Sequence, residues 1–307
     1  MCEHCEQGFN SKVSKREFLK LSLLSLSSFL FLPYQKIFSS ENIYNGPIFD
    51  AHAHVGEKNN LEEIINNFKK VGIERAMLFV ELKDVDVIKK KVGKNFYLFA
   101  DAFKNSKKDN KYKLRNDRFS TLKKHLKNKN ISGVGEFYSL LSIHPSKSPI
   151  RTDLFNNEFK NYLKYLNSKK VIFHIHDELM DKKRQSIFAK YPNVQFILAH
   201  CGYRDPDELE TILQTNNNVF TDLSLVSNNH FGPSKKWGGP KVAINLSKEW
   251  REILIKYSDR FLVGSDISKR RADQLQRVIS DYRKLLGNLP IETAEKIAFK
   301  NFEKLIS

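Results

Sequence analysis

The sequence Phe49-Asp50-Ala51-His52-Ala53-His54-Val55-Gly56 is the first strand-like stretch of the chain, and the fold we predict is organised around it. Side chains alternate between the two faces of a strand, so His52 and His54 point to the same side. Two imidazoles set in this way can bind one metal ion, because neutral imidazole nitrogen is a common ligand of zinc and similar ions. Ordinary surface or core histidines also form His-x-His pairs, so the rest of the chain has to decide.

From residue 47 onward, short apolar runs alternate with longer amphipathic segments, which indicates βα units around a parallel sheet. The pattern predicts strands at residues 47–54, 75–81, 96–101, 131–138, 171–176, 194–200, 219–224 and 261–266. It predicts helices at residues 61–70, 85–92, 118–128, 154–166, 182–191, 206–214 and 248–257, and two more that close the chain. Eight such units in roughly 250 residues are typical of an α/β fold, the (β/α)8 TIM barrel, whose sites lie at the carboxyl ends of the strands.

The first 40 residues have a different character. A basic segment, 14–20, precedes an apolar stretch, 21–32, that is too short to span a bilayer comfortably. The pattern is similar to a twin-arginine export signal, with Lys15 in place of the first arginine. We therefore predict a leader over residues 1–40, a single barrel domain over 47–307, and a protein that is exported to the periplasm or associated with the membrane. A small-residue cleavage site is poorly defined, so an uncleaved leader that tethers the protein to a membrane is the alternative.

Composition bears on the class of partner. The chain has 307 residues, is 40% apolar and 12% aromatic, and has a formal net charge of +17. Such a composition excludes a disordered chain, while the net positive charge makes nucleic acid a candidate partner. The lysines are scattered through helix-like segments, however, with no dense basic run interleaved with aromatics. We therefore expect a small-molecule substrate rather than nucleic acid. A preference for anionic partners and the oligomeric state stay open.

Buried parallel strands should be almost continuously apolar, yet several of the predicted strands end in ionisable residues. These are His52, His54, Glu136, His174, His176, His200 and Asp266. Each lies at or near the carboxyl end of its strand, where a barrel brings its loops together. Burying each of them without a partner would cost on the order of a few kcal/mol. A shared metal ion would supply that partner.

With these motifs, the chain resembles the metal-dependent hydrolases of the amidohydrolase superfamily, in the amidohydrolase-related branch, over about residues 47–307. The motifs are His52-Ala53-His54, His174, Ala199-His200-Cys201-Gly202, Gly264-Ser265-Asp266 and Asn301-Phe302-Glu303-Lys304-Leu305. The resemblance implies that His52, His54, His174 and His200 are metal ligands. It also implies that Asp266 binds or adjoins the metal and is the base that takes a proton from the attacking water.

Two assignments stay open. His174 and His176 share one face of the fifth strand and only one need be a ligand; we favour His174 by its position after Val-Ile-Phe, which leaves His176 to contact substrate or a second metal. Glu136 stands where some relatives carry a carboxylated lysine. It could bridge two ions as a metal ligand, as in the TatD-related nucleases, bind substrate beside a single ion, or be hydrogen-bonded within the barrel. We expect zinc, with manganese as the alternative, and one or two ions.

Residues that follow the strands could contact a substrate. Tyr203 and Arg204 come after the sixth strand, where they could reach a substrate anion or begin the next helix. His230 lies in a long connection after the seventh strand, which could form a lid. Asp222 ends the seventh strand, where it could be the hydrogen-bond partner of a ligand histidine.

These features predict an enzyme, a hydrolase that uses a metal-activated water on a small carboxylate, lactone or amide-type substrate. The alternatives in the same superfamily are a TatD-like phosphodiesterase or nuclease, and a nonoxidative decarboxylase. From a different class, a binding protein could hold metal without turnover. Asp266 argues against that alternative, because a binding site needs no base at the eighth strand.

Overall fold

The computed structural model describes residues 42–55, 61–105, 112–141, 150–225 and 246–307. All of these residues belong to one structural unit, Glu41–Ser307. The predicted leader and His230 lie outside the described residues. None of the described helices is both long enough and apolar enough to cross a membrane.

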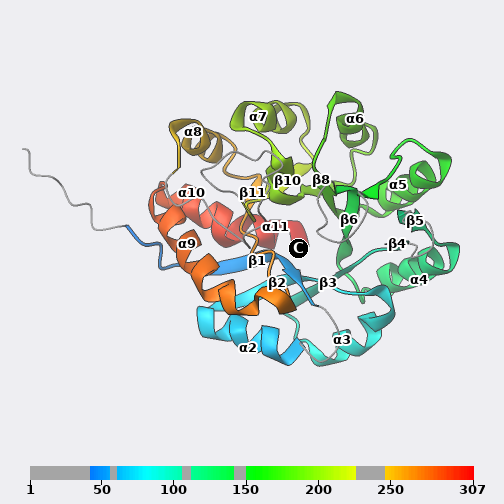
Figure 1. Cartoon of the computed structure of the whole chain (residues 1–307), viewed down its shortest axis with the longest axis horizontal. Coiled ribbons are helices and arrows are strands. Elements are labelled where there is room, and N and C mark those ends of the chain that lie inside the picture. The colour runs from blue at the N-terminus through cyan, green and yellow to red at the C-terminus, as the bar shows by residue number, and fades with distance from the viewer. Residues whose placement is uncertain (1–41, 56–60, 106–111, 142–149, 226–245) are drawn as a thin grey trace, which may run out of the picture. The chain divides into compact units, whose positions relative to one another are not determined.

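Eight parallel strands of the described chain surround a common axis (Figure 1). They are β1 (Ile48–His54), β2 (Ile73–Phe79), β3 (Phe96–Ala100), β6 (Gly133–Leu141), β8 (Ile172–Asp177), β9 (Gln195–Leu198), β10 (Val219–Asp222) and β11 (Phe261–Leu262). Residues after β11 close the ring against β1: Ala51 N–H donates to the Val263 carbonyl (2.8 Å), and His54 N–H donates to the Ile267 carbonyl (2.8 Å). The predicted (β/α)8 barrel is confirmed.

Helices follow the strands around the outside of the barrel (Figure 1). They are α2 (Leu61–Val71), α3 (Val85–Lys91), α4 (Asn116–Lys127), α5 (Asn157–Lys169), α6 (Lys182–Lys190), α7 (Pro206–Thr215), α8 (Lys248–Lys256) and α9 (Leu275–Gly287). Apolar periodicity explains how they pack: Leu61, Ile64 and Phe68 form one buried face of α2. Asn156 and Asp181 cap α5 and α6 by accepting hydrogen bonds from backbone N–H groups in the first turn.

The sequence pattern did not predict three short strands. β4 (Phe103–Asn105) and β5 (Tyr112–Leu114) form an antiparallel hairpin after β3, and β7 (Ile150–Arg151) pairs with the end of β6. Strands of two or three residues are too short to give a periodic signal. The predicted closing helices are α9 and a second helical segment, which consists of α10 (Ile291–Glu295), a π-helical turn over Lys296–Lys300, and α11 (Asn301–Ile306).

The amino-terminal end of the barrel is filled with apolar side chains. Phe49, Met77, Phe99 and Phe220 from the strands form one buried cluster with Phe302 of α11. The ring centroid of Phe302 lies 5.7 Å from that of Phe49, in an edge-on contact. α11 therefore closes this end of the barrel, and the polar strand residues are left at the other end.

Candidate metal centre

Six ionisable side chains converge at the carboxyl-terminal end of the barrel, from three strands and from the segments that follow β9 and β11: His52, His54, Glu136, His176, His200 and Asp266. His54 Nε2 lies 3.2 Å from His52 Nε2, 3.2 Å from Glu136 Oε2 and 3.2 Å from Asp266 Oδ1. The His54 side chain is 24% exposed, against 5% for Asp266 and 3% for Glu136. The cluster is therefore buried, and its open side is at His54.

A bulge in β1 turns both of its histidines inward. Phe49 and Ala51 belong to the cluster inside the barrel. The pairing of β1 with β2 shifts register between Asp50 and Ala53. After this shift His52 and His54 also face the interior, whereas Ala53 packs in the outer cluster between strands and helices. Bulges of this kind re-aim side chains next to functional sites.

A second irregularity, in β6, places Glu136. The pairing of β6 with β8 shifts register between Val134 and Phe137, and Gly135 has a φ of +140°. A Cβ atom at Gly135 would lie only 2.7 Å from the carbonyl oxygen of His174. Glycine is therefore required where β6 approaches β8 and presents Glu136 to the interior.

A left-handed turn carries His200. The φ angles of His200, Cys201, Gly202 and Tyr203 all lie between 53° and 62°. Residues other than glycine rarely adopt this conformation, at a cost of about 1–3 kcal/mol each, and such strain is concentrated at functional sites. The strand predicted over 194–200 accordingly ends at Leu198. The turn brings the His200 and Tyr203 rings to 4.9 and 5.3 Å from the ring of His176.

Asp222, at the end of β10, lies one layer deeper than the six side chains. Its Oδ2 lies 3.1 Å from His52 Nδ1 and 2.9 Å from His174 Nε2. Burial raises the pKa of Asp222, but the neighbouring His52 and His174 hold it well below its usual range. An ionised Asp222 accepts the Nδ1 proton of His52, which leaves the Nε2 lone pair directed at the cluster. Asp222 is thus hydrogen-bonded to a histidine of the candidate site.

The two histidines of β8 occupy different depths. His176 Nδ1 lies 2.9 Å from Glu136 Oε1, and its Nε2 lies 3.5 Å from Glu178 Oε1. His174 faces Asp222 instead, and its buried Nδ1 has no hydrogen-bond partner among the described residues. His176 therefore belongs to the group of six converging side chains, whereas His174 lies deeper in the barrel and contacts Asp222.

Ligand atoms that lie within 4.8 Å of one another form three groups in the described chain: His52, His54 and Glu136; Glu136, His176 and His200; and His52, His200 and Asp222. The first two groups share Glu136. Its Oε2 lies 3.2 Å from His54 Nε2, while its Oε1 lies 2.9 Å from His176 Nδ1 and 3.7 Å from His200 Nε2. Oε1 also lies 3.6 Å from Nε2 of His52, so the Glu136 carboxylate lies between the two groups and contacts members of both.

The chemistry of these donors fits a divalent metal ion. With Nδ1 of His52 donating to Asp222, the lone pair of His52 Nε2 faces Nε2 of His54 at 3.2 Å. Burial lowers the pKa of His52, but the charges of Asp222 and Glu136 raise it well above its usual range. Without a metal, a second proton on His52 Nε2 therefore balances the buried carboxylates; a divalent cation would replace that proton and leave the Nε2 lone pair free to bind it. Imidazole and carboxylate ligands suit zinc and manganese.

The sequence did not point to several residues that support the cluster. The Asp50 carboxylate accepts hydrogen bonds from His52 N–H (3.0 Å), Ser265 N–H (2.9 Å) and the Ser265 hydroxyl (2.5 Å). It joins β1 to the segment that carries Asp266. Ser224 Oγ lies 2.7 Å from His200 Nδ1. The available signal was a charged residue inside a buried strand, two positions before the His-x-His pair.

The predicted substrate contacts lie in different places. The Tyr203 ring centroid is 5.3 Å from those of both His176 and His200, so this residue borders the cluster. The Arg204 guanidinium donates to the Glu178 carbonyl (3.2 Å) and to the Glu208 carboxylate (3.2 Å), so it is held against α7. A further neighbour is Tyr138, whose ring lies 5.4 Å from His176 and whose hydroxyl is hydrogen-bonded to Glu136.

Fold and site together define a (β/α)8 barrel with a histidine–carboxylate cluster at the carboxyl ends of its strands, where enzymes with this fold place their active sites. A family model described as Amidohydrolase matches residues 120–267, a range that includes Glu136, His176, His200 and Asp266 but not His52 or His54. This match covers just under half of the chain, and it agrees with the resemblance to the amidohydrolase superfamily that the sequence motifs indicated. No curated protein sequence matches the chain.

Solved structures with the same fold differ strongly in sequence. A probable 2-pyrone-4,6-dicarboxylic acid hydrolase from Acinetobacter baumannii matches with a TM-score of 0.59 at 13% identity, over 85% of this chain and 99% of that one. An uncharacterised TIM-barrel protein from Bordetella bronchiseptica matches with a TM-score of 0.58 at 11% identity, over 84% and 97%. A TatD homologue from Escherichia coli matches with a TM-score of 0.57 at 12% identity, over 84% and 97%. These similarities show the fold.

Proposed function

We propose that this protein is a hydrolase that uses one or two divalent metal ions, zinc or manganese, to activate water for attack on a small carboxylate, lactone or amide-type substrate. The observation that carries the proposal is the convergence of His52, His54, His176 and His200 on the shared carboxylate of Glu136. When bound, the metal would lower the pKa of water toward neutrality and polarise the substrate oxygen.

The residues divide into roles by position. His52, His54, Glu136 and Asp266 would hold one ion, and Glu136, His176 and His200 would hold a second. Asp266 Oδ1 lies 3.2 Å from His54 Nε2, beside the exposed edge of the cluster, where a water molecule and a substrate can approach. Its carboxylate would accept a proton from the attacking water and return it to the leaving group. Tyr203 would donate a hydrogen bond to the substrate oxygen on which negative charge develops.

Phosphodiester hydrolysis is a second candidate activity. The sharing of Glu136 between two donor groups favours it, because two-ion sites can stabilise both the attacking and the leaving oxygen in phosphoryl transfer. The TatD homologue with this fold is consistent with that candidate at the level of architecture. No feature of the described residues favours the decarboxylase alternative.

The leader pattern supports a further part of the proposal, that the barrel works outside the cytoplasm. The basic segment 14–20 and the apolar stretch 21–32 are typical of export signals. Fractionation of cells that produce the full chain would test this location, with the protein expected in the periplasmic or membrane fraction.

Metal content tests the proposed centre most directly. We expect the purified full chain to contain one or two equivalents of zinc or manganese by mass spectrometry. The His200→Ala variant should lose the ion that Glu136, His176 and His200 would hold, and most of the metal if there is only one ion. His125→Ala is a matched control, because His125 is also buried but lies on α4 with Asp86 and Asn130 as neighbours. Absence of metal after reconstitution with zinc and with manganese would contradict the proposal.

The metal-loaded chain can then be assayed with a panel of lactones and amides and, in parallel, with bis(p-nitrophenyl) phosphate. Turnover of the carbonyl compounds alone supports the first activity, and turnover of the phosphodiester alone supports the second. Asp266→Asn should abolish either activity, because it removes the proton acceptor.

A further inference from the structure

A basic groove lies at the end of the barrel opposite the histidine–carboxylate cluster. It has a volume of about 600 Å³ and lies between α4 and α5. Ile131 and Ser132, which lead into β6, and Val171, which leads into β8, form part of its wall. Because both strands begin here, the groove opens at the amino-terminal end of the barrel.

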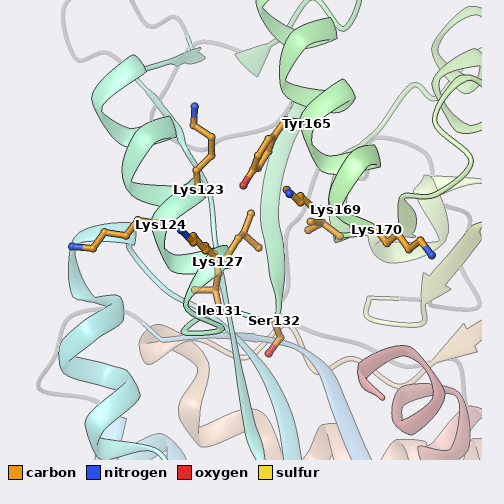
Figure 2. Close-up of a pocket in the computed structure, with 10 residues that line it drawn as sticks. Lys123, Lys124, Lys127, Ile131, Ser132, Tyr165, Lys169 and Lys170 are labelled. Carbon is orange, nitrogen blue, oxygen red and sulfur yellow. The ribbon is translucent and has the colours of Figure 1, made fainter.

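Five lysines line this groove (Figure 2): Lys123, Lys124, Lys127, Lys169 and Lys170. In Figure 2 the ends of Lys169 and Tyr165 point into the space between the two helices, whereas Lys124 and Lys170 extend outward on either side. Lys123 Nζ lies 4.6 Å from the centre of the Phe119 ring. Within the described chain none of the five lysines has a carboxylate at ion-pair distance, in contrast to Lys256, which lies 2.5 Å from Glu210.

The charge of the groove continues around the same end of the barrel. Each outer helix runs back from the carboxyl end of a strand, so its last turn lies at the amino-terminal end. The last turns of α2, α3, α4, α5, α6, α8 and α9 all contain lysine. One or two cations balance the dipole of a helix, but five lysines at the ends of α4 and α5 exceed that need. The excess favours an anionic partner.

Exposed apolar side chains share this end. Ile43 is 49% exposed and Ile291 is 63% exposed, and both line a second cavity, of about 390 Å³, where residues 42–46 enter the barrel beside α9 and α10. Surfaces that bind lipid bilayers combine basic groups with apolar side chains that enter the headgroup layer. Nucleic-acid surfaces rely instead on basic groups with aromatic platforms for the bases. Among the residues that line the lysine groove, Tyr165 alone is aromatic, so the groove offers one such platform rather than a series of them.

We propose that the amino-terminal end of the barrel docks on an anionic phospholipid bilayer, with a lipid phosphate seated among the lysines of the α4–α5 groove. This orientation leaves the histidine–carboxylate cluster facing away from the membrane, open to soluble substrate. The docking surface is independent of the proposed hydrolysis and of the fate of the leader.

Vesicle binding tests the proposal with the full chain. We expect sedimentation with vesicles of phosphatidylcholine and phosphatidylglycerol, and much weaker sedimentation with vesicles of phosphatidylcholine alone. Added salt should release the protein, because the attraction is screened. Loss of one lysine near the bilayer should weaken binding about fivefold, so the triple variant Lys124→Gln/Lys127→Gln/Lys169→Gln should bind about a hundredfold more weakly.

A control variant that loses the same charge elsewhere shows whether binding depends on the groove or only on the net charge of the protein. Lys182, Lys183 and Lys248 lie in the first turns of α6 and α8, at the opposite end of the barrel. Their replacement by glutamine should leave vesicle binding within about twofold of the parent chain. An equal loss in both triple variants would overturn the proposal, as would equal binding to both kinds of vesicle. Groove-dependent binding of duplex DNA without binding to anionic vesicles would overturn it in favour of nucleic acid. Thermal unfolding of each variant confirms that the fold is retained.

Discussion

At the scale of single residues, Asp50 is the clearest example of a side chain that shapes the cluster without belonging to it. Its carboxylate fixes the backbone of His52 and of Ser265, which precede His54 and Asp266. We expect Asp50→Asn to lower the free energy of unfolding by about 1–3 kcal/mol, because an amide leaves one of the buried donors unpaired. It should also weaken metal retention, measured by mass spectrometry after dialysis, because the two flanking ligands lose their common anchor.

Asp101→Asn is the control for this substitution. Asp101 is also a buried carboxylate, and it accepts a hydrogen bond from Phe103 N–H (3.1 Å) after β3. Its loss should reduce stability while metal content stays unchanged. Equal metal content in Asp50→Asn and Asp101→Asn would show that Asp50 stabilises the barrel without positioning the ligands.

Glu178 has a comparable role on the other side of the cluster, since its Oε1 lies 3.5 Å from His176 Nε2. A carboxylate behind a ligand imidazole orients the ring and raises its basicity, and its loss costs about 10–100-fold in metal affinity. We expect Glu178→Ala to weaken the ion held by Glu136, His176 and His200 by this factor in calorimetric titration. Glu178→Gln should restore part of the affinity, because the amide oxygen can still face Nε2.

The outer carboxylate Glu208, which pairs with Arg204, provides the matched control for Glu178. Glu208→Ala should leave both metal affinities unchanged, because exposed ion pairs contribute little. Loss of affinity at both ion sites in Glu178→Ala would mean that Glu178 acts on the whole cluster rather than on His176.

At the scale of elements, irregular strands place the site. Gly135 sits in the bulge of β6, with a φ of +140° and no room for a Cβ against His174. We expect Gly135→Ala to lower the free energy of unfolding by about 2–4 kcal/mol in denaturant titration, through strain and overpacking. Gly93→Ala should be nearly neutral, since no atom lies within 4 Å of the Cβ it would add. Similar losses in both variants would remove the structural argument for a glycine in the bulge.

The elements also show what a sequence can predict. Apolar runs located all eight barrel strands, because burial on both faces leaves a continuous signal, although the eighth strand, predicted over 261–266, consists only of Phe261–Leu262. The same periodicity placed His174 and His176 on one face, but it carries no information on depth. The separation of His174, on Asp222, from His176, on Glu136, arises from packing between strands. The left-handed turn at His200 is likewise a product of tertiary context, since its residues other than Gly202 do not favour that conformation.

At the scale of the whole molecule, metal binding should be coupled to stability. The buried carboxylates of Glu136, Asp222 and Asp266 face imidazoles that must otherwise carry protons. A metal present at a thousandfold its dissociation constant adds about 4 kcal/mol to the free energy of unfolding, or roughly 10 °C in Tm for a domain of this size. Scanning calorimetry with and without a chelator should show this difference. His200→Ala should show a much smaller one, and an unchanged Tm in the parent chain would contradict tight binding.

The apolar end of the barrel contributes to stability and the opposite end holds the candidate metal centre. A substitution at the apolar end should therefore change stability without changing metal content. Phe302 of α11 is 1% exposed and joins the end of the chain to Phe49 of β1, so removing its ring opens a cavity under the barrel. We expect Phe302→Ala to lower the free energy of unfolding by about 3–5 kcal/mol while the folded protein keeps its metal equivalents, because the cluster lies at the opposite end. Ile291→Ala, at a side chain that is 63% exposed, should change stability by less than about 0.5 kcal/mol. Loss of metal from folded Phe302→Ala would show instead that the apolar end holds the ligand strands in register, and that the barrel transmits packing changes along its full length.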